Sequence, residues 1–362
     1  MSVVNHLPSL DSAYWPCYHA VMSESHFPYL ALPGGDPAGI GVEILLKALR
    51  KDPTEATVGL IVITDGPLLQ KSAADLALET PFVITVTNLA ELQEAVNRRL
   101  SPILFSQTFV DLSTFAYGVI NAQCGLAAYE AIKVAVEVVQ AGIAQAIVTP
   151  PLHKEALRAA GIDEIGHTEI LSTLTGTTKA VTMFETHGLK IFFHSRHLSL
   201  REACDAVTYQ SLLETIIECE AITCSNPQGF DLNKPLAVAA LNPHGGDGGL
   251  FGREEIEHII PAIEEAQKHG INVVGPIGAD SVFHQGRIGM WRAVISLYHD
   301  QGHIAAKTYD FNQTISITWG LPFLRTSVDH GTAFDIAGKN IADASGMVRA
   351  IEVAAQYLTE GI

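Results

Sequence analysis

Residues 293–307 combine an apolar run with a dense group of titratable side chains. The run at 293–298 (AVISLY) predicts a buried strand; His299, Asp300 and His303 follow directly, and Lys307 lies a little further along. Open α/β sheets bind their ligands beyond the carboxyl ends of such strands. Imidazole and carboxylate groups there could hold a metal ion or transfer a proton, with the lysine as a nearby positive charge. The alternative interpretation is an ordinary strand end with a structural histidine.

Two further apolar segments also end in polar loops that carry histidines. The segment ending at Phe193 leads to His194 and His197, and the segment ending at Leu241 leads to His244. Parallel strands place their carboxyl ends on the same side of a sheet, so three such loops could bring three imidazoles together. Three neutral ligands leave a divalent cation its full charge and an open position for a substrate. A chain with 15 histidines will also carry some at strand ends without any metal role.

Two other places could bind an anion. His167 and Thr168 stand just before an expected helix, where Thr168 could be the N-cap and free N–H groups would suit an anion. Arg325 follows an expected buried strand, where a guanidinium suits two-point binding of carboxylate or phosphate. A plain helix cap and a structural salt bridge are the respective alternatives.

Residues 34–41 (GGDPAGIG) join an expected strand at 29–33 to an expected helix at 42–50. A strand, a glycine-rich turn and a helix N-terminus form a unit that can bind an anion. The spacing is neither GxGxxG nor that of a P-loop. The alternative is a tight turn whose glycines serve only the backbone geometry.

The elements that must position these residues alternate regularly between strand and helix. This alternation predicts an α/β fold with a mainly parallel, helix-covered sheet. The expected strands are 29–33, 58–64, 82–87, 144–149, two between 180 and 193, 235–241, 271–274, 293–298 and 314–318, and the expected helices are 42–50, 68–78, 89–100, 123–140, 153–160, 206–224, 253–269 and 345–358.

Composition limits the class of protein. The 362 residues suffice for two domains or one large α/β domain with an insertion, and a hydrophobic content of 48% indicates a globular chain. A net charge of -17 repels phosphate backbones and anionic lipids, which argues against nucleic-acid and membrane partners. The five scattered cysteines contain no CxxC pair and fit a reducing compartment. With no membrane span or secretory signal, we expect a cytoplasmic protein with an irregular N-terminal arm at 1–28.

Several segments, taken together and in order, resemble the 4-hydroxythreonine-4-phosphate dehydrogenase family. This family serves pyridoxal phosphate biosynthesis and has relatives that oxidise sugar-acid phosphates or dihydrodiols. The resemblance runs from about residue 30 to the C-terminus, and ordered matches of this length are far more specific than any single glycine motif. The segments are 35–41 (GDPAGIG), 149–154 (TPPLHK), 166–169 (GHTE), 241–249 (LNPHGGDGG), 298–302 (YHDQG) and 320–332 (GLPFLRTSVDHGT).

The resemblance implies the two-domain α/β fold of isocitrate and isopropylmalate dehydrogenases. It implies a homodimer whose active site lies in the cleft between domains, near the subunit interface. We expect residues 29–150 plus 320–362 to form an α/β domain with cofactor-binding segments, and 151–319 a domain with most metal and substrate residues. The cofactor would be NAD or NADP, bound near residues 329–338 through contacts that the sequence leaves unassigned.

The resemblance also implies roles for individual residues. It places a divalent metal (zinc, magnesium, manganese or cobalt) on His197, His244 and His299. Spacing alone could not choose these over the neighbouring histidines. It assigns substrate contacts to His167, Thr168, Lys307 and Arg325, matches a substrate-binding asparagine with Ser316, and leaves Lys307, Asp247 and Asp300 as candidates for the catalytic base.

Two positions depart from the family pattern. Ser316 replaces the asparagine, and Asp247 stands where glutamate is common. Because serine has no amide, the distal end of the substrate could differ. We expect oxidation of the secondary hydroxyl of 4-phosphohydroxy-L-threonine, or of a four-carbon hydroxy-acid phosphate such as threonate or erythronate 4-phosphate, followed by decarboxylation. The alternatives are a cis-dihydrodiol carboxylate dehydrogenase of the same family, a metal-dependent hydrolase and a non-catalytic metabolite-binding protein.

Overall fold

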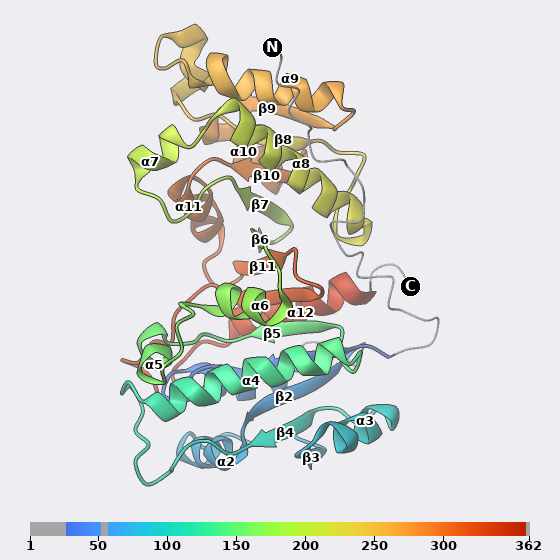
Figure 1. Ribbon diagram of the computed structural model, residues 1–362, viewed down its shortest axis with the longest axis vertical. Helices are drawn as coiled ribbons and strands as arrows, with labels where there is room; N and C mark the ends of the chain where they lie inside the picture. Colours follow the sequence, from blue (N-terminus) through green and yellow to red (C-terminus); the bar gives the residue numbers. More distant parts are fainter. Residues whose placement is uncertain (1–26, 52–56, 360–362) are drawn as a thin grey trace. The chain divides into compact units, whose positions relative to one another are not determined.

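The computed structural model describes residues 27–51 and 57–359 (Figure 1). The chain forms two compact units, which are described separately. Among the described residues, unit 1 comprises 183–309, and unit 2 comprises 27–51, 57–182 and 310–359. The expected domain ranges differ from these units at 151–182 and 310–319, and they stay a prediction. The expected arm at 1–28 lies outside the described residues except for its last two.

The sheet of unit 2 has the strand order β3-β4-β2-β1-β5-β12-β11. Its strand pairs are parallel except β11 with β12, which is antiparallel. β1 and β2 are buried along their whole length, as strands covered on both faces are. The strands are β1 (Tyr29–Pro33), β2 (Gly59–Asp65), β3 (Ile84–Val86), β4 (Ile103–Gln107), β5 (Ala146–Thr149), β11 (Ile315–Trp319) and β12 (Leu324–Val328).

The helices of unit 2 bury apolar faces against this sheet. The long helix α4 runs along the strands in Figure 1, and its alanine and valine side chains join the main core. Gly125 of α4 allows close packing on α5, because an added Cβ would lie 2.1 Å from the Ala156 carbonyl oxygen. The helices are α1 (Gly41–Leu49), α2 (Gly66–Asp75), α3 (Leu89–Asn97), α4 (Ala122–Gln140), α5 (Lys154–Ala159), α6 (His167–Thr175) and α12 (Ser345–Thr359).

The strands of unit 1 follow the order β6-β7-β10-β8-β9. β6 and β7 form an antiparallel hairpin, whereas β7, β10, β8 and β9 run parallel to one another. The strands are β6 (Val181–Thr186), β7 (Leu189–Phe193), β8 (Leu236–Ala239), β9 (Val273–Ile277) and β10 (Ala293–Ser296). The regular helices are α7 (Leu200–Asp205), α8 (Tyr209–Ser225), α9 (Ile260–Lys268), α10 (Ala279–Arg287) and α11 (His299–Tyr309); short turns are η3 (Pro227–Gly229), η4 (Pro243–Gly249) and η5 (Glu255–Ile259).

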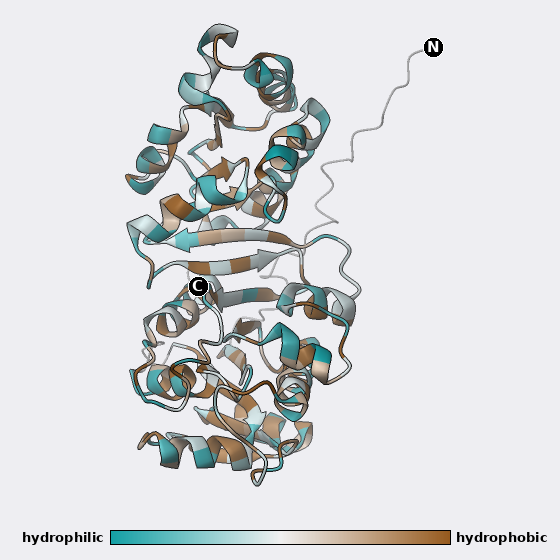
Figure 2. Cartoon of the chain, turned by 90° about the vertical axis from the view of Figure 1, so that its left-hand side faces the viewer, coloured by the Kyte–Doolittle hydropathy of each residue, from teal (hydrophilic) through white to brown (hydrophobic). Residues whose placement is uncertain are grey.

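Hydrophobic residues gather along the strands, while hydrophilic residues predominate on many helices and loops (Figure 2). The mixed α/β fold with mainly parallel strands, expected from the sequence, is confirmed. The sequence did not predict β4, β12, α7 or α10. The helix expected from residue 206 begins at Tyr209, because Thr208 forms a capping box with Ser211.

Two corrections concern the candidate site. His299 opens helix α11, not a loop, and Arg325 lies inside strand β12, not after a strand. The sequence pattern did not predict α11, because Gly302 interrupts the run of helix-forming residues. In the structure this glycine permits close packing on β7, since an added Cβ would lie 2.6 Å from the Phe193 ring.

Candidate active site

The three histidine-bearing segments follow strands that are neighbours in unit 1. β10 lies between β7 and β8 and is parallel to both, so the three carboxyl ends lie at one edge of the sheet. His197 follows β7, His244 follows β8, and His299 follows β10. This edge is where an open α/β sheet binds its ligand.

The imidazoles of His197 and His299 lie near each other. Their ring centroids are 6.3 Å apart and the rings are tilted by 40°. A metal–nitrogen bond of about 2 Å puts a coordinated ring centre about 3 Å from the ion, so two rings bound at a tetrahedral angle have centres about 5 Å apart. The two rings are therefore somewhat further apart than two ligands of one tetrahedral ion. Nδ1 of His299 lies 2.6 Å from Oδ1 of Asp300, a contact that orients the imidazole and leaves Nε2 as the nitrogen for a metal.

His303 supports the ring of His299. Its Nδ1 donates to the carbonyl oxygen of His299 at 2.8 Å, and the two imidazoles stack with centroids 3.6 Å apart. The His303 ring also packs on Phe184 and Phe193, at 4.4 and 4.6 Å. This packing gives His303 a structural role and favours His299 as the ligand.

His194 is also held by the protein itself. Its Nδ1 lies 2.8 Å from the hydroxyl of Thr215, and its Nε2 lies 3.2 Å from the carbonyl oxygen of Ala206. Burial lowers the pKa of this imidazole, against the smaller opposing effect of the Ala206 carbonyl. Both nitrogens are therefore engaged, whereas His197 is exposed in the same loop.

His244 lies on η4, a turn with unusual backbone geometry. Six successive residues from His244 have positive φ, and His244, Gly245, Asp247 and Gly248 lie in the left-handed helical region. The buried carboxylate of Glu255 holds the start of the turn by accepting from the backbone N–H groups of Leu241 and Asn242, at 2.9 and 2.7 Å. Such strain persists only where the surroundings enforce it, and it is typical of functional sites.

The third imidazole is not grouped with the other two. Within residues 27–51 and 57–359 of a single chain, no three His, Cys, Asp or Glu side chains are close enough together to hold a metal ion. Within the described part of one chain, His197 and His299 are thus neighbours, and they do not form a group of three with His244. His244 remains exposed on its turn.

Two of the three candidate bases, Lys307 and Asp247, lie on the same elements as His299 and His244. Lys307 is eight residues after His299 on α11, so the two share a helix face about 12 Å apart along the axis. Asp247 is exposed on η4, three residues after His244, with φ of 44°.

Arg325 is a buried cation in the sheet of unit 2. Its Nε and Nη2 donate to the hydroxyl of Thr149, at 3.0 and 2.7 Å, and its Nη1 donates to the hydroxyl of Thr318 at 3.0 Å. The side chain is 5% exposed. Neutral hydroxyls thus orient the guanidinium, and no acidic side chain appears among these three contacts.

His167 lies near Arg325, at the first position of α6. Burial lowers the pKa of His167 well below its usual value, and the charge of Arg325 lowers it further. Its Nε2 is buried and has no hydrogen-bond partner among the described residues. The imidazole is therefore neutral at physiological pH. The N-cap expected at Thr168 is wrong, because Gly166 takes that position and Thr168 lies inside the helix.

Ser316 belongs to the same polar face of the sheet as Arg325. It is 9% exposed and pairs with Ser327 across the antiparallel β11–β12 ladder. Thr318 pairs with Arg325 in that ladder. Residues opposite one another, or two apart on one strand, point to the same side, so all four side chains share one face.

Backbone N–H groups of the glycine-rich turn in unit 2 are hydrogen-bonded within the protein. The N–H groups of Asp36 and Ile40 donate to the carbonyl oxygens of Pro151 and Thr332, at 3.1 and 3.0 Å. Residues 34–41 are all buried. These glycines serve close packing, and the anion-binding interpretation of this turn is not supported.

Two residues that contact the candidate site residues or their turn were not assigned a role from the sequence. Glu255 holds the His244 turn, and Thr149 orients Arg325. Thr149 stands in the TPPLHK segment, and Glu255 follows the glycine-rich loop in a run of acidic residues. The sequence does not predict either contact, because neither follows a helical or strand periodicity, and Thr149 and Arg325 are far apart in the chain.

A separate groove of about 580 Å³ lies between α10 and α11 in unit 1. Its lining includes Arg287 and Tyr309, whose guanidinium and ring are 4.6 Å apart, but none of the candidate site residues.

A comparison with known protein families shows to which family the chain belongs. The family model described as pyridoxal phosphate biosynthetic protein PdxA matches residues 56–354. The chain belongs to this family. The expected enzyme class, a dehydrogenase, is confirmed by the names of its relatives.

Two related proteins align with this chain over nearly their whole length. A protein of Fusobacterium nucleatum named "Putative D-threonate 4-phosphate dehydrogenase" is 47% identical over 91% of this chain and 96% of its own. A Halalkalibacterium halodurans protein of the same name is 46% identical over 91% and 97%.

Solved structures agree with the fold. The crystal structure of 4-hydroxythreonine-4-phosphate dehydrogenase from Klebsiella pneumoniae has a TM-score of 0.79 and 34% identity, covering 93% of this chain and 99% of that one. A corresponding Burkholderia phymatum structure has a TM-score of 0.77 and 34% identity, covering 92% and 99%. A terephthalate dihydrodiol dehydrogenase from Burkholderia xenovorans, at 24% identity and a TM-score of 0.60 over 91% and 98%, shares the fold.

Proposed function

We propose that this PdxA-family dehydrogenase oxidises D-threonate 4-phosphate with NAD or NADP and a divalent cation. The observation that carries the proposal is the 47% identity, over almost the full length, to a relative named for this substrate. Three relatives of solved structure that are named for 4-hydroxythreonine 4-phosphate are 34% to 38% identical.

Ser316 supports this choice of substrate. The two compounds differ at C2, where threonate carries a hydroxyl and hydroxythreonine an amine. A buried serine hydroxyl on the face that carries Arg325 offers a smaller polar group than an amide. Because buried polar sites reject ligands that leave a group unpaired, one side-chain change here can redirect specificity.

The proposed reaction has two steps. A hydride leaves C3 for the nicotinamide ring while the C3 hydroxyl loses its proton, which gives a β-keto acid. The C1–C2 bond then breaks, carbon dioxide leaves, and the electron pair forms an enolate that is protonated at C2. The product is dihydroxyacetone phosphate.

The chain's own residues would bind and orient the substrate. Arg325, buried and held by two threonines, would bind an anionic group of the substrate in a fixed direction. His167 would act as a neutral donor or acceptor beside it, together with Thr168. Lys307 would add a second positive charge, and Lys307 or Asp247 would take the proton of the hydroxyl.

His197, His244 and His299 would hold the cation. A divalent metal there would lower the pKa of the hydroxyl and stabilise the enolate charge. Asp300 would keep the imidazole of His299 in its coordinating tautomer. The protein would act as a homodimer, with His244 reaching the other two histidines across the subunit contact.

The deciding experiment is a substrate panel. Purified protein with Mg²⁺, Mn²⁺ or Zn²⁺ and either dinucleotide would receive D-threonate, D-erythronate and L-hydroxythreonine 4-phosphates and a cis-dihydrodiol carboxylate. We expect the highest kcat/KM with D-threonate 4-phosphate, with equal amounts of reduced nicotinamide and dihydroxyacetone phosphate. A higher kcat/KM with another compound would identify that compound as the preferred substrate in place of D-threonate 4-phosphate. No reduced nicotinamide from any of them would reject the dehydrogenase.

A further inference from the structure

The segment from 331 to 344, between β12 and α12, depends on outside contacts for its conformation. It contains no regular helix or strand. Two of its non-glycine residues, Ala333 and Asn340, have φ of 44° and 57°, in the left-handed region that costs side chains energy. Such residues persist only where the surroundings over-determine them.

One anchor lies at the start of this segment. The carbonyl oxygen of Thr332 accepts from the N–H of Ile40 at 3.0 Å. The ring of Phe334 stacks on His153, with centroids 4.4 Å apart and an angle of 26°. His153 follows Thr149 by four residues, and Thr149 orients Arg325. The start of the segment thus packs against the part of unit 2 that holds the buried guanidinium.

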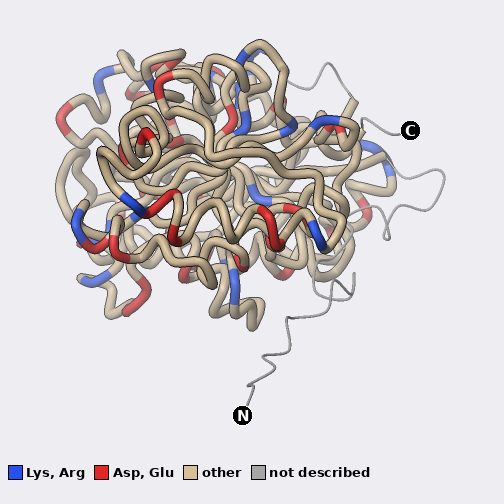
Figure 3. Tube along the Cα trace, turned by 90° about the horizontal axis from the view of Figure 1, so that it is seen from above, with Lys and Arg blue, Asp and Glu red and all other residues tan. Residues whose placement is uncertain are grey.

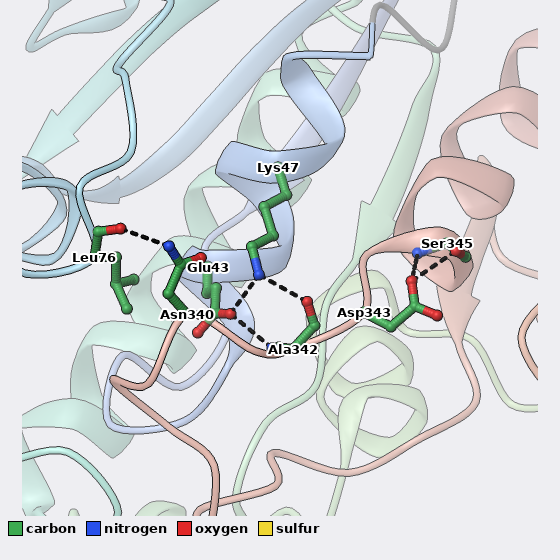
Figure 4. Close-up of polar contacts among 7 residues, drawn as sticks. All are labelled: Glu43, Lys47, Leu76, Asn340, Ala342, Asp343 and Ser345. Atoms are coloured by element: carbon green, nitrogen blue, oxygen red, sulfur yellow. Dashed lines mark hydrogen bonds and ion pairs between the residues drawn. The ribbon is translucent and has the colours of Figure 1, made fainter.

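The other anchor is a pair of charged side chains on α1 (Figure 4). Oε1 of Glu43 accepts from the N–H of Ala342 at 2.8 Å and from Nζ of Lys47 at 2.7 Å. The same Nζ donates to the carbonyl oxygen of Ala342 at 2.8 Å. The pair therefore satisfies both backbone groups of one residue. Asn340 adds a bond from Nδ2 to the carbonyl oxygen of Leu76, at 2.8 Å.

This pair differs from an ordinary helical ion pair. Lys71 and Asp75 on α2 have the same i,i+4 spacing and the same 2.7 Å distance, but both are about one-third exposed. Among the described residues their hydrogen bonds are with each other and with Tyr117, and none joins them to 331–344. Glu43 is 2% exposed. A buried carboxylate is costly unless it is well paired, so its bonds to Ala342 are strongly favoured.

We propose that Glu43 and Lys47 are positioning residues for the dehydrogenase. By holding Ala342 they keep residues 331–344 in their strained conformation. This keeps Phe334 against His153 and preserves the orientation of the Thr149–Arg325 pair for the substrate anion. The proposal rests on the proposed function, because Arg325 is a substrate residue only there.

The test uses the full-length protein with Lys47→Met, Lys47→Arg and Lys71→Met. Lys47→Met keeps the aliphatic stem and removes the charge. We expect faster backbone hydrogen exchange at 332–344 and at 149–154, and a KM for D-threonate 4-phosphate raised about tenfold with kcat changed by less than about threefold. Lys47→Arg should restore both readouts in part, and Lys71→Met should change neither.

Each other result counts against one part of the argument. Unchanged exchange at 332–344 in Lys47→Met would overturn the anchor. Faster exchange with an unchanged KM would overturn the positioning role and leave a structural one. A wild-type protein that does not oxidise the substrate would reject the proposed function, while the exchange at 149–154 would still report whether the anchor reaches the arginine segment.

Discussion

The carboxyl group of Asp36 is fully buried in unit 2, in the turn between β1 and α1. Its Oδ1 accepts from the N–H of Ala38 at 2.9 Å, whereas Oδ2 is buried without a partner among the described residues. Burial raises the pKa of Asp36 to about 6, against the lowering effects of the Ala38 bond and the charge of His153. A single residue thus makes the stability of the protein depend on pH.

We predict that Asp36→Asn removes this dependence. Between the ordinary pKa of 3.8 and about 6, the folded chain binds more protons at this position than the unfolded chain. The free energy of unfolding of the wild type should therefore fall as pH rises through this range, by up to about 3 kcal/mol relative to Asp36→Asn. Asparagine can keep the bond to Ala38 and has no charge. Urea unfolding of both proteins between pH 4 and pH 7 measures the difference, and parallel stability curves would contradict the prediction.

Among the elements, the turn η4 shows how backbone geometry places a candidate ligand. It presents His244 from a run of six residues with positive φ, four of them glycine. Gly246 packs against the carboxylate that holds the turn, since an added Cβ would lie 2.8 Å from Oε2 of Glu255. Gly248 has a similar φ of +67°, and an added Cβ would meet nothing within 4 Å.

These two glycines provide a matched pair of variants. Alanine at either position should cost about 1–2 kcal/mol of stability through its backbone conformation. Only Gly246→Ala should also displace Glu255 and disturb His244. We predict that Gly246→Ala weakens Mn²⁺ binding at least tenfold, while Gly248→Ala leaves it within about twofold of the wild type. Calorimetric titration with Mn²⁺ and urea unfolding separate the two effects. Equal losses of Mn²⁺ affinity in both variants would mean that the Glu255 contact does not position the histidine.

At the scale of the whole molecule, charge and assembly govern the proposed site. Acidic and basic residues are interspersed in Figure 3, although acidic residues dominate the total of -17. None of the described helices is both long and apolar enough to cross a membrane. The positive groups proposed for the substrate, Lys307 and Arg325, are therefore local exceptions in an acidic chain. In the proposed homodimer, the exposed His244 of one copy is expected to complete the site of its partner.

Mixed dimers test this sharing of the site. In a dimer of His244→Ala with His299→Ala, one of the two sites would keep all three histidines. We predict that co-refolded mixtures of these inactive variants recover a substantial fraction of wild-type turnover with D-threonate 4-phosphate. Mixtures of His197→Ala with His299→Ala should recover none, because both residues belong to the same half-site. If turnover recovers in both mixtures, His197 and His299 of one site come from different subunits. If it recovers in neither mixture, all three ligands of a site come from one chain.

Sequence patterns predicted most strands of the two units and most of the helices that cover them, because long apolar runs have few alternative structures. They failed at α11, where Gly302 and polar residues hide a helix that packs closely on β7. They also placed Arg325 after a strand. A charged residue inside a buried strand is unexpected until the hydroxyls of Thr149 and Thr318 are seen around its guanidinium.

The sequence alone determined the α/β class, the family and the three strands that are followed by histidine-bearing segments, because these depend on the order of residues along the chain. Only the tertiary structure decided which imidazoles are engaged by the protein, since His194 and His303 are occupied by partners far from them in sequence or by packing. It also decided that the glycine-rich turn is filled and that Glu43 and Lys47 hold Ala342. Contacts between residues hundreds of positions apart leave no periodic signal, so they appear only when the chain is folded.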